Sequence, residues 1–327
     1  MWRWAKRTLV GLGGLLVVAV SAGAAYQWIA TRNDLSANPP PGRLIDVGGH
    51  RVHILCTGSG DPTVVLESGL GSAGTIGWSL VQSEVSKFTR VCSYDRAGMG
   101  YSDPGPSPRT AGRITRELEL LLDRSDIREP VILVGASIGG LYMRVYASEH
   151  EQRVAGLVLV DGSHEEQEMD IPGVAPFVPL LSTIGVFRLL GVSFGGNADA
   201  LPPSVRGSAR ATAFRASAYQ ATANEGMHLP ETAAEVRASR RKLNIPVVVV
   251  TAGLGADSGW QRLQRDQIRL STRGCQVIAE RSGHVIPLAQ PSAVVEPIRA
   301  LVRMTRERKV IPLCGTLGEA RRPVVAP

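Results

Sequence analysis

The chain has 327 residues, of which 44% are hydrophobic, and a formal net charge of +7 at pH 7. This length suits one large or two ordinary globular domains, and the hydrophobic content is ample for a sizeable core. No run of basic residues interleaved with aromatic residues is present, so a nucleic-acid partner is not indicated. Much of the excess positive charge lies at the two ends, in Arg3, Lys6 and Arg7 and in residues 303–322. A basic flank beside an apolar segment indicates membrane topology before it indicates a ligand.

An uncharged apolar segment covers residues 8–30. About twenty apolar residues are enough to cross a bilayer as a helix, so residues 1–30 are predicted to be a signal-anchor or transmembrane helix. The basic residues before the segment predict a cytoplasmic N-terminus and an extracytoplasmic remainder. The polar, proline-rich residues 31–42 are then expected to be a linker.

A cleaved signal peptide is the alternative interpretation of this segment. Residues 22–24, Ala-Gly-Ala, match the small-residue pattern of a signal-peptidase site. The apolar stretch is longer than a usual signal core, which favours an uncleaved anchor. Under either interpretation the rest of the chain is exported, as a membrane-anchored or as a secreted domain.

The four cysteines of the chain are Cys56, Cys92, Cys275 and Cys314. In an exported chain they permit two disulfides, in any of three connectivities. The alternative is that each is a small buried apolar residue. No C-x-x-C or Cys/His spacing predicts a metal site.

Short apolar strands alternate with segments of helical spacing from residue 43 onwards. Residues 43–56 alternate enough to predict a hairpin around Gly48 and Gly49. Further strands are predicted at residues 63–67, 89–94, 131–134, 154–160, 246–251 and 275–279. Helices are predicted at residues 76–88, 110–122, 139–150, 261–270 and 291–304. This alternation is typical of a mostly parallel sheet covered by helices on both faces.

Residues 162–243 interrupt the alternation, because they contain helical segments and no clear strand. We interpret this stretch as an inserted helical cap rather than as a second independent domain. Its apolar residues are expected to line an acyl pocket, to dock on the membrane or simply to pack on the core. They are Phe177, Val178, Leu180, Leu181, Ile184, Val186 and Phe187.

The stretch around Ser137 has the pattern of a nucleophile elbow. Residues 130–142 have the sequence PVILVGASIGGLY, in which an apolar strand, a glycine-rich turn and a helical segment follow one another. Small residues two positions before and after the serine let the strand and the helix approach closely. The turn also directs the backbone N–H of Ile138 toward whatever Ser137 attacks, at the positive end of a helix. The alternative is that GASIGG is only a glycine-rich turn.

The order of the motifs resembles that of a known superfamily. A hairpin is followed by SGLG, DRAGMGYSD, GASIGG, LVLVD, the cap, PVVVVTAG and SGH. Over residues 43–304 this order is similar to the α/β-hydrolase fold, in its cap-bearing serine hydrolase branch of esterases and lipases. The resemblance implies an eight-stranded, mostly parallel sheet flanked by helices, in a domain of residues 43–308 with a tail at 309–327.

A serine hydroxyl is a weak nucleophile and needs a base that takes its proton. Of the six histidines, His284 in Ser-Gly-His follows the last predicted strand, where the resemblance places the base. The acid can be Asp161, which ends the strand after that of the nucleophile, or Asp257, which lies beyond the next strand. Asp257 has the more usual spacing to the histidine. Asp161 lies directly at a strand end and is favoured.

A second oxyanion donor is expected on the loop after residues 63–67. The superfamily commonly has His-Gly there, whereas this chain has Ser68 and Gly69, followed by Leu70. The backbone N–H of Leu70 is still available, because the turn needs a glycine and no particular side chain. We therefore expect Leu70 and Ile138 to stabilise the oxyanion together.

A dinucleotide-binding site is a competing hypothesis. Residues 69–74 match G-x-G-x-x-G between a strand and a helix, and Asp95 ends the next strand. Against it, the strand is not the first of the fold, and nicotinamide cofactors are scarce outside the cytoplasm. Asp95 and Arg96 are expected instead to brace the loop below the site, as in similar hydrolases.

Taken together, the motifs predict an extracytoplasmic serine hydrolase that cleaves an ester or similar acyl substrate without a cofactor or metal. A cofactor-free perhydrolase or a lactonase would use the same three residues. From a different class, a hydrolase-like binding or scaffold protein without turnover is the alternative. A dinucleotide-dependent oxidoreductase is disfavoured.

Overall fold

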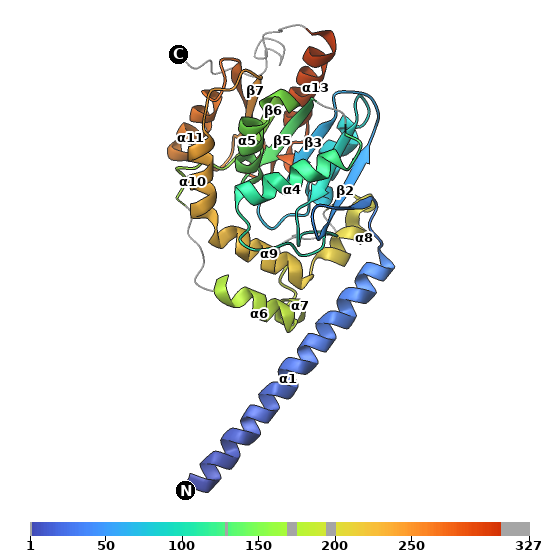
Figure 1. The fold of residues 1–327 in the computed structure, drawn as a ribbon, viewed down its shortest axis with the longest axis vertical. Coiled ribbons are helices and arrows are strands. Elements are labelled where there is room, and N and C mark those ends of the chain that lie inside the picture. The colour runs from blue at the N-terminus through green and yellow to red at the C-terminus, as the bar shows by residue number, and fades with distance from the viewer. Residues whose placement is uncertain (1, 128–129, 169–174, 194–200, 309–327) are drawn as a thin grey trace.

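A twisted sheet lies at the centre of the computed structural model, which describes residues 2–127, 130–168, 175–193 and 201–308 (Figure 1). The eight strands follow the order β1-β2-β4-β3-β5-β6-β7-β8. β2 alone runs opposite to the other seven strands, so the eight-stranded, mostly parallel sheet expected from the sequence is confirmed. The strands are β1 (Arg43–Asp46), β2 (Arg51–Thr57), β3 (Val64–Glu67), β4 (Val91–Asp95), β5 (Val131–Ala136), β6 (Val154–Val160), β7 (Val247–Ala252) and β8 (Gly274–Ala279).

The central strands are buried on both faces, as their continuous apolar sequences predict. Alternate residues of one strand enter opposite cores: Val64 and Leu66 pack toward one face and Val65 toward the other. Helices α3 (Ser79–Val85), α12 (Ile286–Ala289) and α13 (Ser292–Glu307) cover the first face. The second face is covered by α4 (Ala111–Asp123), α5 (Gly139–Glu149) and α11 (Ser258–Ile268).

The helix predicted at residues 76–88 is divided in two. A short α2 (Gly74–Gly77) precedes α3, and Trp78, with φ −97° and ψ 2°, separates them. Its side chain is 1% exposed and belongs to the core that the sheet forms with α3, α12 and α13. The apolar spacing of this stretch therefore indicated the buried face correctly but not the interruption.

The described residues between β6 and β7 include six helical segments, and we call residues 162–243 the cap. It lies over one end of the sheet, on the side from which the N-terminal helix leaves (Figure 1). Its elements are η2 (Ala175–Phe177), α6 (Val178–Thr183), α7 (Val186–Leu189), α8 (Pro203–Thr212), α9 (Ala216–Met227) and α10 (Leu229–Ser239).

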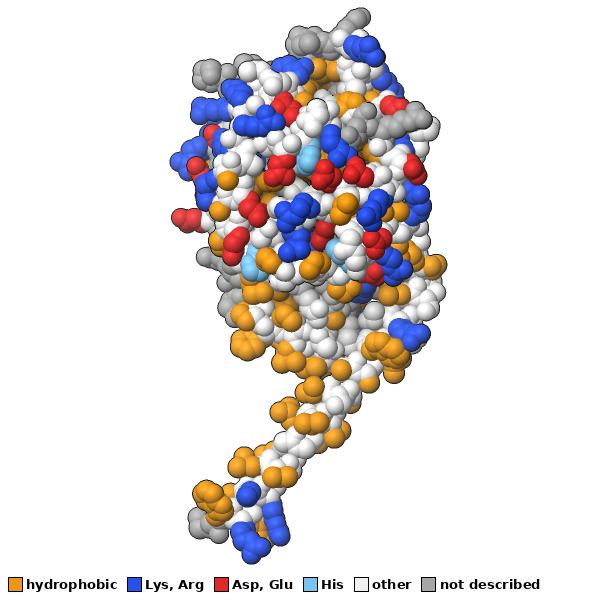
Figure 2. Space-filling model, in the orientation of Figure 1, with side chains coloured by type: hydrophobic (Ala, Val, Ile, Leu, Met, Phe, Trp, Pro, Cys, Tyr) orange, Lys and Arg blue, Asp and Glu red, His pale blue; other side chains and the backbone are white. Residues whose placement is uncertain are grey.

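The N-terminal helix α1 (Trp2–Ala37) is 36 residues long and projects from the domain. It is long and apolar enough to cross a membrane, since an 18-residue window within it has a mean hydropathy of 2.0. Figure 2 shows hydrophobic side chains along it and basic side chains at its free end. The helix continues through residues 31–37, so the linker expected at residues 31–42 is wrong for that part. The helix ends just before three consecutive prolines that begin at Pro39, because the helical conformation is disfavoured for a residue that precedes proline.

The C-terminal half of α1 packs on the cap through residues on one face of the helix. Gly23 faces the turn between α6 and α7, because a Cβ there would lie 2.5 Å from the carbonyl oxygen of Ile184. Arg188 donates to Gln27 Oε1 at 3.0 Å and pairs with Asp34 at 2.7 Å. The 3.6-residue repeat of a helix brings these positions onto one face. α1 is thus continuous with the folded domain rather than attached by a flexible linker.

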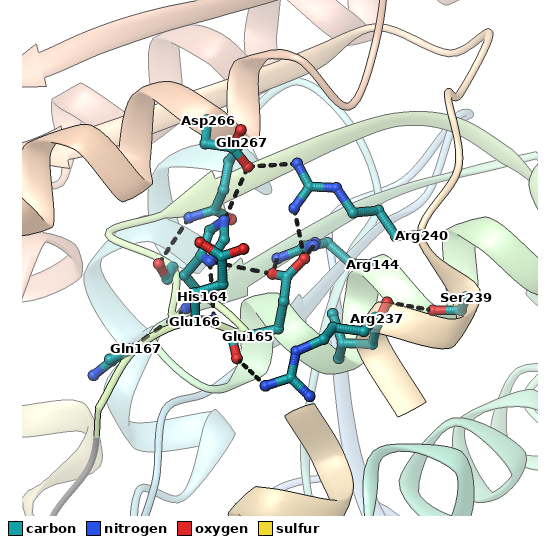
Figure 3. Close-up of polar contacts among 12 residues, drawn as sticks. Arg144, His164, Glu165, Glu166, Gln167, Arg237, Ser239, Arg240, Asp266 and Gln267 are labelled. Carbon is teal, nitrogen blue, oxygen red and sulfur yellow. Dashed lines mark hydrogen bonds and ion pairs between the residues drawn. The ribbon is translucent and has the colours of Figure 1, made fainter. Parts of the chain in front are cut away.

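A buried charged cluster joins the start of the cap to the layer of α5 and α11 (Figure 3). Glu165, just after β6, accepts hydrogen bonds from Arg144 of α5 at 2.7 and 2.9 Å and from Arg240 at 2.6 Å. The neighbouring His164 contacts Asp266 of α11 at 3.0 Å. Burial acts to raise the pKa of Glu165, but the hydrogen bonds and charge of Arg144 outweigh it and lower the pKa to about 2.

Replacing Glu165 by Gln is expected to cost about 3 kcal/mol in the free energy of unfolding at pH 7, because Arg144 loses its buried partner. The depressed pKa gives stability that is present above about pH 4.5 and is lost as pH falls toward about 2. The difference between wild type and Glu165→Gln should therefore shrink from pH 7 to pH 3 in urea titrations of the detergent-solubilised chain. Glu84→Gln, in an exposed pair with Lys87, is the matched control and should change stability by less than about 0.5 kcal/mol. A difference that stays constant with pH would contradict this account.

Candidate active site

Ser137 lies at the tip of the turn between β5 and α5. Its φ is +52°, a strained value for a residue with a side chain. Its backbone N–H donates to the carbonyl of Val160 at 3.1 Å, and its carbonyl accepts from the N–H of Ser163 at 2.8 Å. The end of β6 and the residues that follow it thus hold both backbone groups of Ser137, and the serine has the backbone geometry that the elbow pattern predicted.

The small residues around Ser137 are required by close packing. A Cβ at Gly139 would lie 2.6 Å from the carbonyl oxygen of Ser68, and one at Gly135 would lie 2.6 Å from the carbonyl oxygen of Gly139. Neither contact can be relieved by moving a flexible side chain, because both involve backbone atoms. The glycines therefore let the strand, the helix and the loop after β3 meet beside Ser137.

His284 contacts Asp161. The distance between His284 Nδ1 and Asp161 Oδ2 is 2.6 Å, and the carboxylate is buried while the imidazole is half-exposed. The other carboxylate oxygen accepts hydrogen bonds from the backbone N–H of Ala252 at 3.0 Å and from Trp260 Nε1 at 2.9 Å. A carboxylate held in this way fixes the orientation and tautomer of the imidazole.

Asp257 has a different role in the structure. Its Oδ1 accepts a hydrogen bond from the backbone N–H of Trp260 at 2.7 Å, so it is the N-cap of α11. Of the two candidate acids, Asp161 is the one that contacts His284. Sequence reasoning missed Trp260, although its position three residues after an N-cap aspartate placed it in the first turn of a helix beside the site.

The two expected oxyanion donors are the backbone N–H groups of Leu70, on the loop after β3, and of Ile138, the residue that follows Ser137 in the elbow turn. Among the described residues, neither N–H has a hydrogen-bond acceptor. The Ile138 N–H precedes α5, and Gly69, next to Leu70, lies close to Ser137, since a Cβ at Gly69 would be 3.2 Å from that of Ser137. The two groups are therefore free to donate to a ligand atom.

Arg96 supports the loop that carries Leu70. Its guanidinium donates to the carbonyl oxygens of Ser68 at 2.7 Å and Gly69 at 3.0 Å, as the sequence led us to expect. It also pairs with Glu67 at 2.5 Å and with Glu225 of α9 at 2.8 Å. Burial acts against the charge of Arg96, but the two carboxylates outweigh it and hold the pKa of Arg96 well above its ordinary value. Sequence reasoning missed both glutamates, although a glutamate at the end of a buried apolar strand was a signal.

Ser137 and His284 border one pocket of about 540 Å³. Leu70 and Met99 line one part of it. The cap side is formed by α8 and α9, by Ala213 between them and by Leu201, two residues before α8, rather than by the apolar residues 177–187 singled out in the sequence. Lining residues from this side are Leu201, Ala209, Thr212, Ala213, Ala218 and Tyr219.

Asp95 is not available to a nucleotide ribose. Its side chain is fully buried, and its oxygens accept hydrogen bonds from Thr75, Tyr101 and the ring of His53. The glycine-rich residues 69–74 instead form the loop beside Ser137 and the start of α2. The match to a dinucleotide fingerprint therefore arises from the packing of this loop.

Cys56 and Cys92 form a disulfide between the paired strands β2 and β4. This is one of the pairings that the four cysteines permit. Cys275 is buried in β8, and Cys314 lies outside the described residues.

Comparison with known proteins gives one family match. A model described as the alpha/beta hydrolase family matches residues 64–296. The probable transporter efuK of Hormonema carpetanum is 36% identical over 130 residues, which are 37% of this chain and 18% of that protein. The chain thus spans less than a fifth of the length of that curated relative.

Solved structures of the same fold include enzymes. An esterase from Thermogutta terrifontis has a TM-score of 0.60 and 22% identity, over 78% of this chain and 93% of the esterase. An enol-lactonase from Burkholderia xenovorans LB400 has a TM-score of 0.61 and 19% identity, over 80% of this chain and the whole of that chain. At these identities the likeness shows the fold.

Replacing Gly139 by Ala should destabilise the protein by about 1–3 kcal/mol, because the added methyl group must displace the loop at Ser68. The matched control is Gly226→Ala in α9, where a Cβ meets nothing within 4 Å. That change should stabilise by about 0.5–1 kcal/mol, since alanine is the better helix former. Thermal or urea unfolding of both variants measures the contrast. Equal effects of the two substitutions would show that the close approach at Gly139 is not needed.

Proposed function

Since the chain belongs to the alpha/beta hydrolase family, we propose that it is a serine hydrolase that cleaves an ester or similar acyl substrate. The observation that carries the proposal is the 2.6 Å contact between His284 Nδ1 and Asp161 Oδ2, beside a pocket that Ser137 and His284 both border. This is the arrangement that a weak hydroxyl nucleophile needs.

In the proposed mechanism Ser137 Oγ attacks the carbonyl carbon of the substrate, and His284 Nε2 takes the hydroxyl proton. Asp161 stabilises the imidazolium that forms, through the contact with Nδ1. His284 then gives the proton to the leaving alcohol as the carbon–oxygen bond breaks, which leaves an acyl group on Ser137. A water molecule, deprotonated by His284, releases the acid in the second half of the reaction.

The oxyanion of each tetrahedral intermediate is assigned to the N–H groups of Leu70 and Ile138. Both lack an acceptor among the described residues, and Arg96 holds the loop of the first through two backbone carbonyls. Donors placed before the reaction need no reorganisation when charge develops, and each is worth about 3 kcal/mol to an acyl-transfer transition state.

We place this activity outside the cytoplasm, in a domain of residues 43–308 whose N-terminal helix anchors it in a membrane. The support is the apolar α1 with basic residues at its start and the disulfide between Cys56 and Cys92, a bond that persists in oxidising compartments. Residues 1–30 would form the anchor and residues 309–327 a tail. If the first segment is cleaved, the same domain is secreted.

Fluorophosphonate labelling tests the nucleophile. Wild-type protein should label covalently, Ser137→Ala should not, and Ser83→Ala on the exposed side of α3 should label as wild type does. The probe modifies only an activated serine, so this result also separates a hydrolase from a binding or scaffold protein without turnover. A wild-type chain that resists the probe, or a Ser137→Ala chain that still labels, would exclude the proposed reaction.

The triad acid is tested by comparing Asp161→Asn with Asp257→Asn on a series of p-nitrophenyl esters. Asp161→Asn should lower kcat about 10³-fold or more, because an amide at this position favours the wrong tautomer of His284. Asp257→Asn should leave kcat within about threefold, since asparagine is also a good N-cap. A collapse of kcat in Asp257→Asn alone would reverse the assignment.

A further inference from the structure

An exposed apolar surface lies on the cap beside α1, and we call it the α6–α7 face. The exposed fractions of its large apolar side chains range from 48% to 79%. Its members are Phe177, Leu180, Leu189, Leu190 and Val192. In Figure 2, hydrophobic side chains gather at the end of the domain from which α1 leaves, whereas charged side chains concentrate farther from α1.

The position of this face along α1 agrees with the thickness of a bilayer. Residues 2–22 of α1 are all exposed, and contact with the cap begins at Gly23. The uncharged part of α1 begins at Thr8, directly after Arg7. At 1.5 Å per residue, about 20 residues cross the hydrocarbon core of a membrane, which is about 30 Å thick, so the helix leaves the hydrocarbon near Gln27.

The α6–α7 face lies at that same level. Gly185, in the turn between α6 and α7, is in contact with α1, since a Cβ there would be 3.5 Å from the carbonyl oxygen of Gly23 and 3.4 Å from Gln27. Tyr26 and Trp28 of α1 are half-exposed at this depth, as aromatic residues at a membrane boundary are. Gln27 and Asp34 of α1 both bind Arg188 of α7. The depth of the α6–α7 face in the membrane is therefore fixed by α1.

One aromatic layer separates the face from the pocket. Phe187 of α7 stacks on Tyr219 of α9, with ring centroids 4.6 Å apart. Tyr219 borders the pocket that contains Ser137, and its hydroxyl donates to the carbonyl of Val192 at 2.5 Å. Helix α8 also lines the pocket and packs against α1.

We propose that the α6–α7 face docks on the boundary of the bilayer that α1 spans, and that the pocket takes its substrate from this lipid phase. The substrate class is then an amphiphile whose acyl ester lies near the membrane surface. The substrate part of this inference depends on the serine hydrolase function proposed above, whereas the docking part does not.

Docking is tested with the full-length protein in liposomes of phosphatidylcholine and phosphatidylglycerol that contain a phospholipid with a photoactivatable diazirine in its acyl chain. After illumination, mass spectrometry should find lipid adducts on residues 177–192 as well as on α1, and none on the distant α13. α1 is the internal positive control for reconstitution. Adducts on α1 alone, as expected if a second copy of the chain covers the face, would overturn the proposal.

The variant for this test is Leu189→Ser combined with Leu190→Ser. Both side chains are largely exposed, so the fold does not depend on them. Adducts on the remainder of the face should fall about tenfold, because two leucine side chains no longer leave water on docking. Leu254→Ser, on the loop after β7, changes an exposed leucine that is not a member of the face and should leave the adducts unchanged.

The substrate class is tested by kcat/KM for two esters in the same liposomes. For a long-chain ester dissolved in the lipid, the double variant should lose about tenfold, whereas for water-soluble p-nitrophenyl acetate it should match wild type. Equal losses on both esters, or no loss on either, would overturn the lipid-phase source. If the wild type hydrolyses neither ester, the proposed function and the substrate part fail together, while the lipid adducts still decide the docking.

Discussion

The parallel register of β5, β6 and β7 is the constraint on which the site depends. Ala136 pairs with Val160, and Val160 pairs with Val250. The residues that follow Ala136 and Val160 in the chain therefore emerge at the same edge of the sheet. These residues are Ser137 and Asp161, and both have a positive φ. The backbone N–H of Ser137 donates to the carbonyl of Val160 in β6, and that of Asp161 donates to the carbonyl of Val250 in β7. The sheet itself therefore fixes the expected nucleophile and its acid relative to each other, and only His284 comes from a loop.

The loop that carries Leu70 is not supported by the sheet alone. Arg96 connects its carbonyls to Glu67 at the end of β3 and to Glu225 in α9, so one buried guanidinium joins the loop, the sheet and the cap. Buried charges are tolerated only when their partners are all present. A displacement of α9 would therefore also disturb the loop beside Ser137, and the cap and the proposed oxyanion site behave as one unit.

Most of the sheet and the elbow could be predicted because their signals are local. A buried parallel strand is a short apolar run, and the turn at Ser137 needs glycines at set positions. The choice between Asp161 and Asp257 depended on how far two loops reach, which spacing does not encode. Trp260 and Glu225 escaped prediction for the same reason, since their partners are distant in sequence. The extension of α1 through residues 31–37 arises from contacts with the cap that polar composition alone could not indicate.

The packing of α1 on the cap has a consequence for how the protein is processed. The residues that hold Arg188 are Gln27, Thr31 and Asp34, and all lie beyond the Ala-Gly-Ala sequence that ends at Ala24. Cutting there would remove the exposed apolar part of α1 and leave these three contacts with Arg188 on the domain. An anchored and a shed form of the molecule would then share the same cap and pocket, and would differ in whether they diffuse in two dimensions or in three.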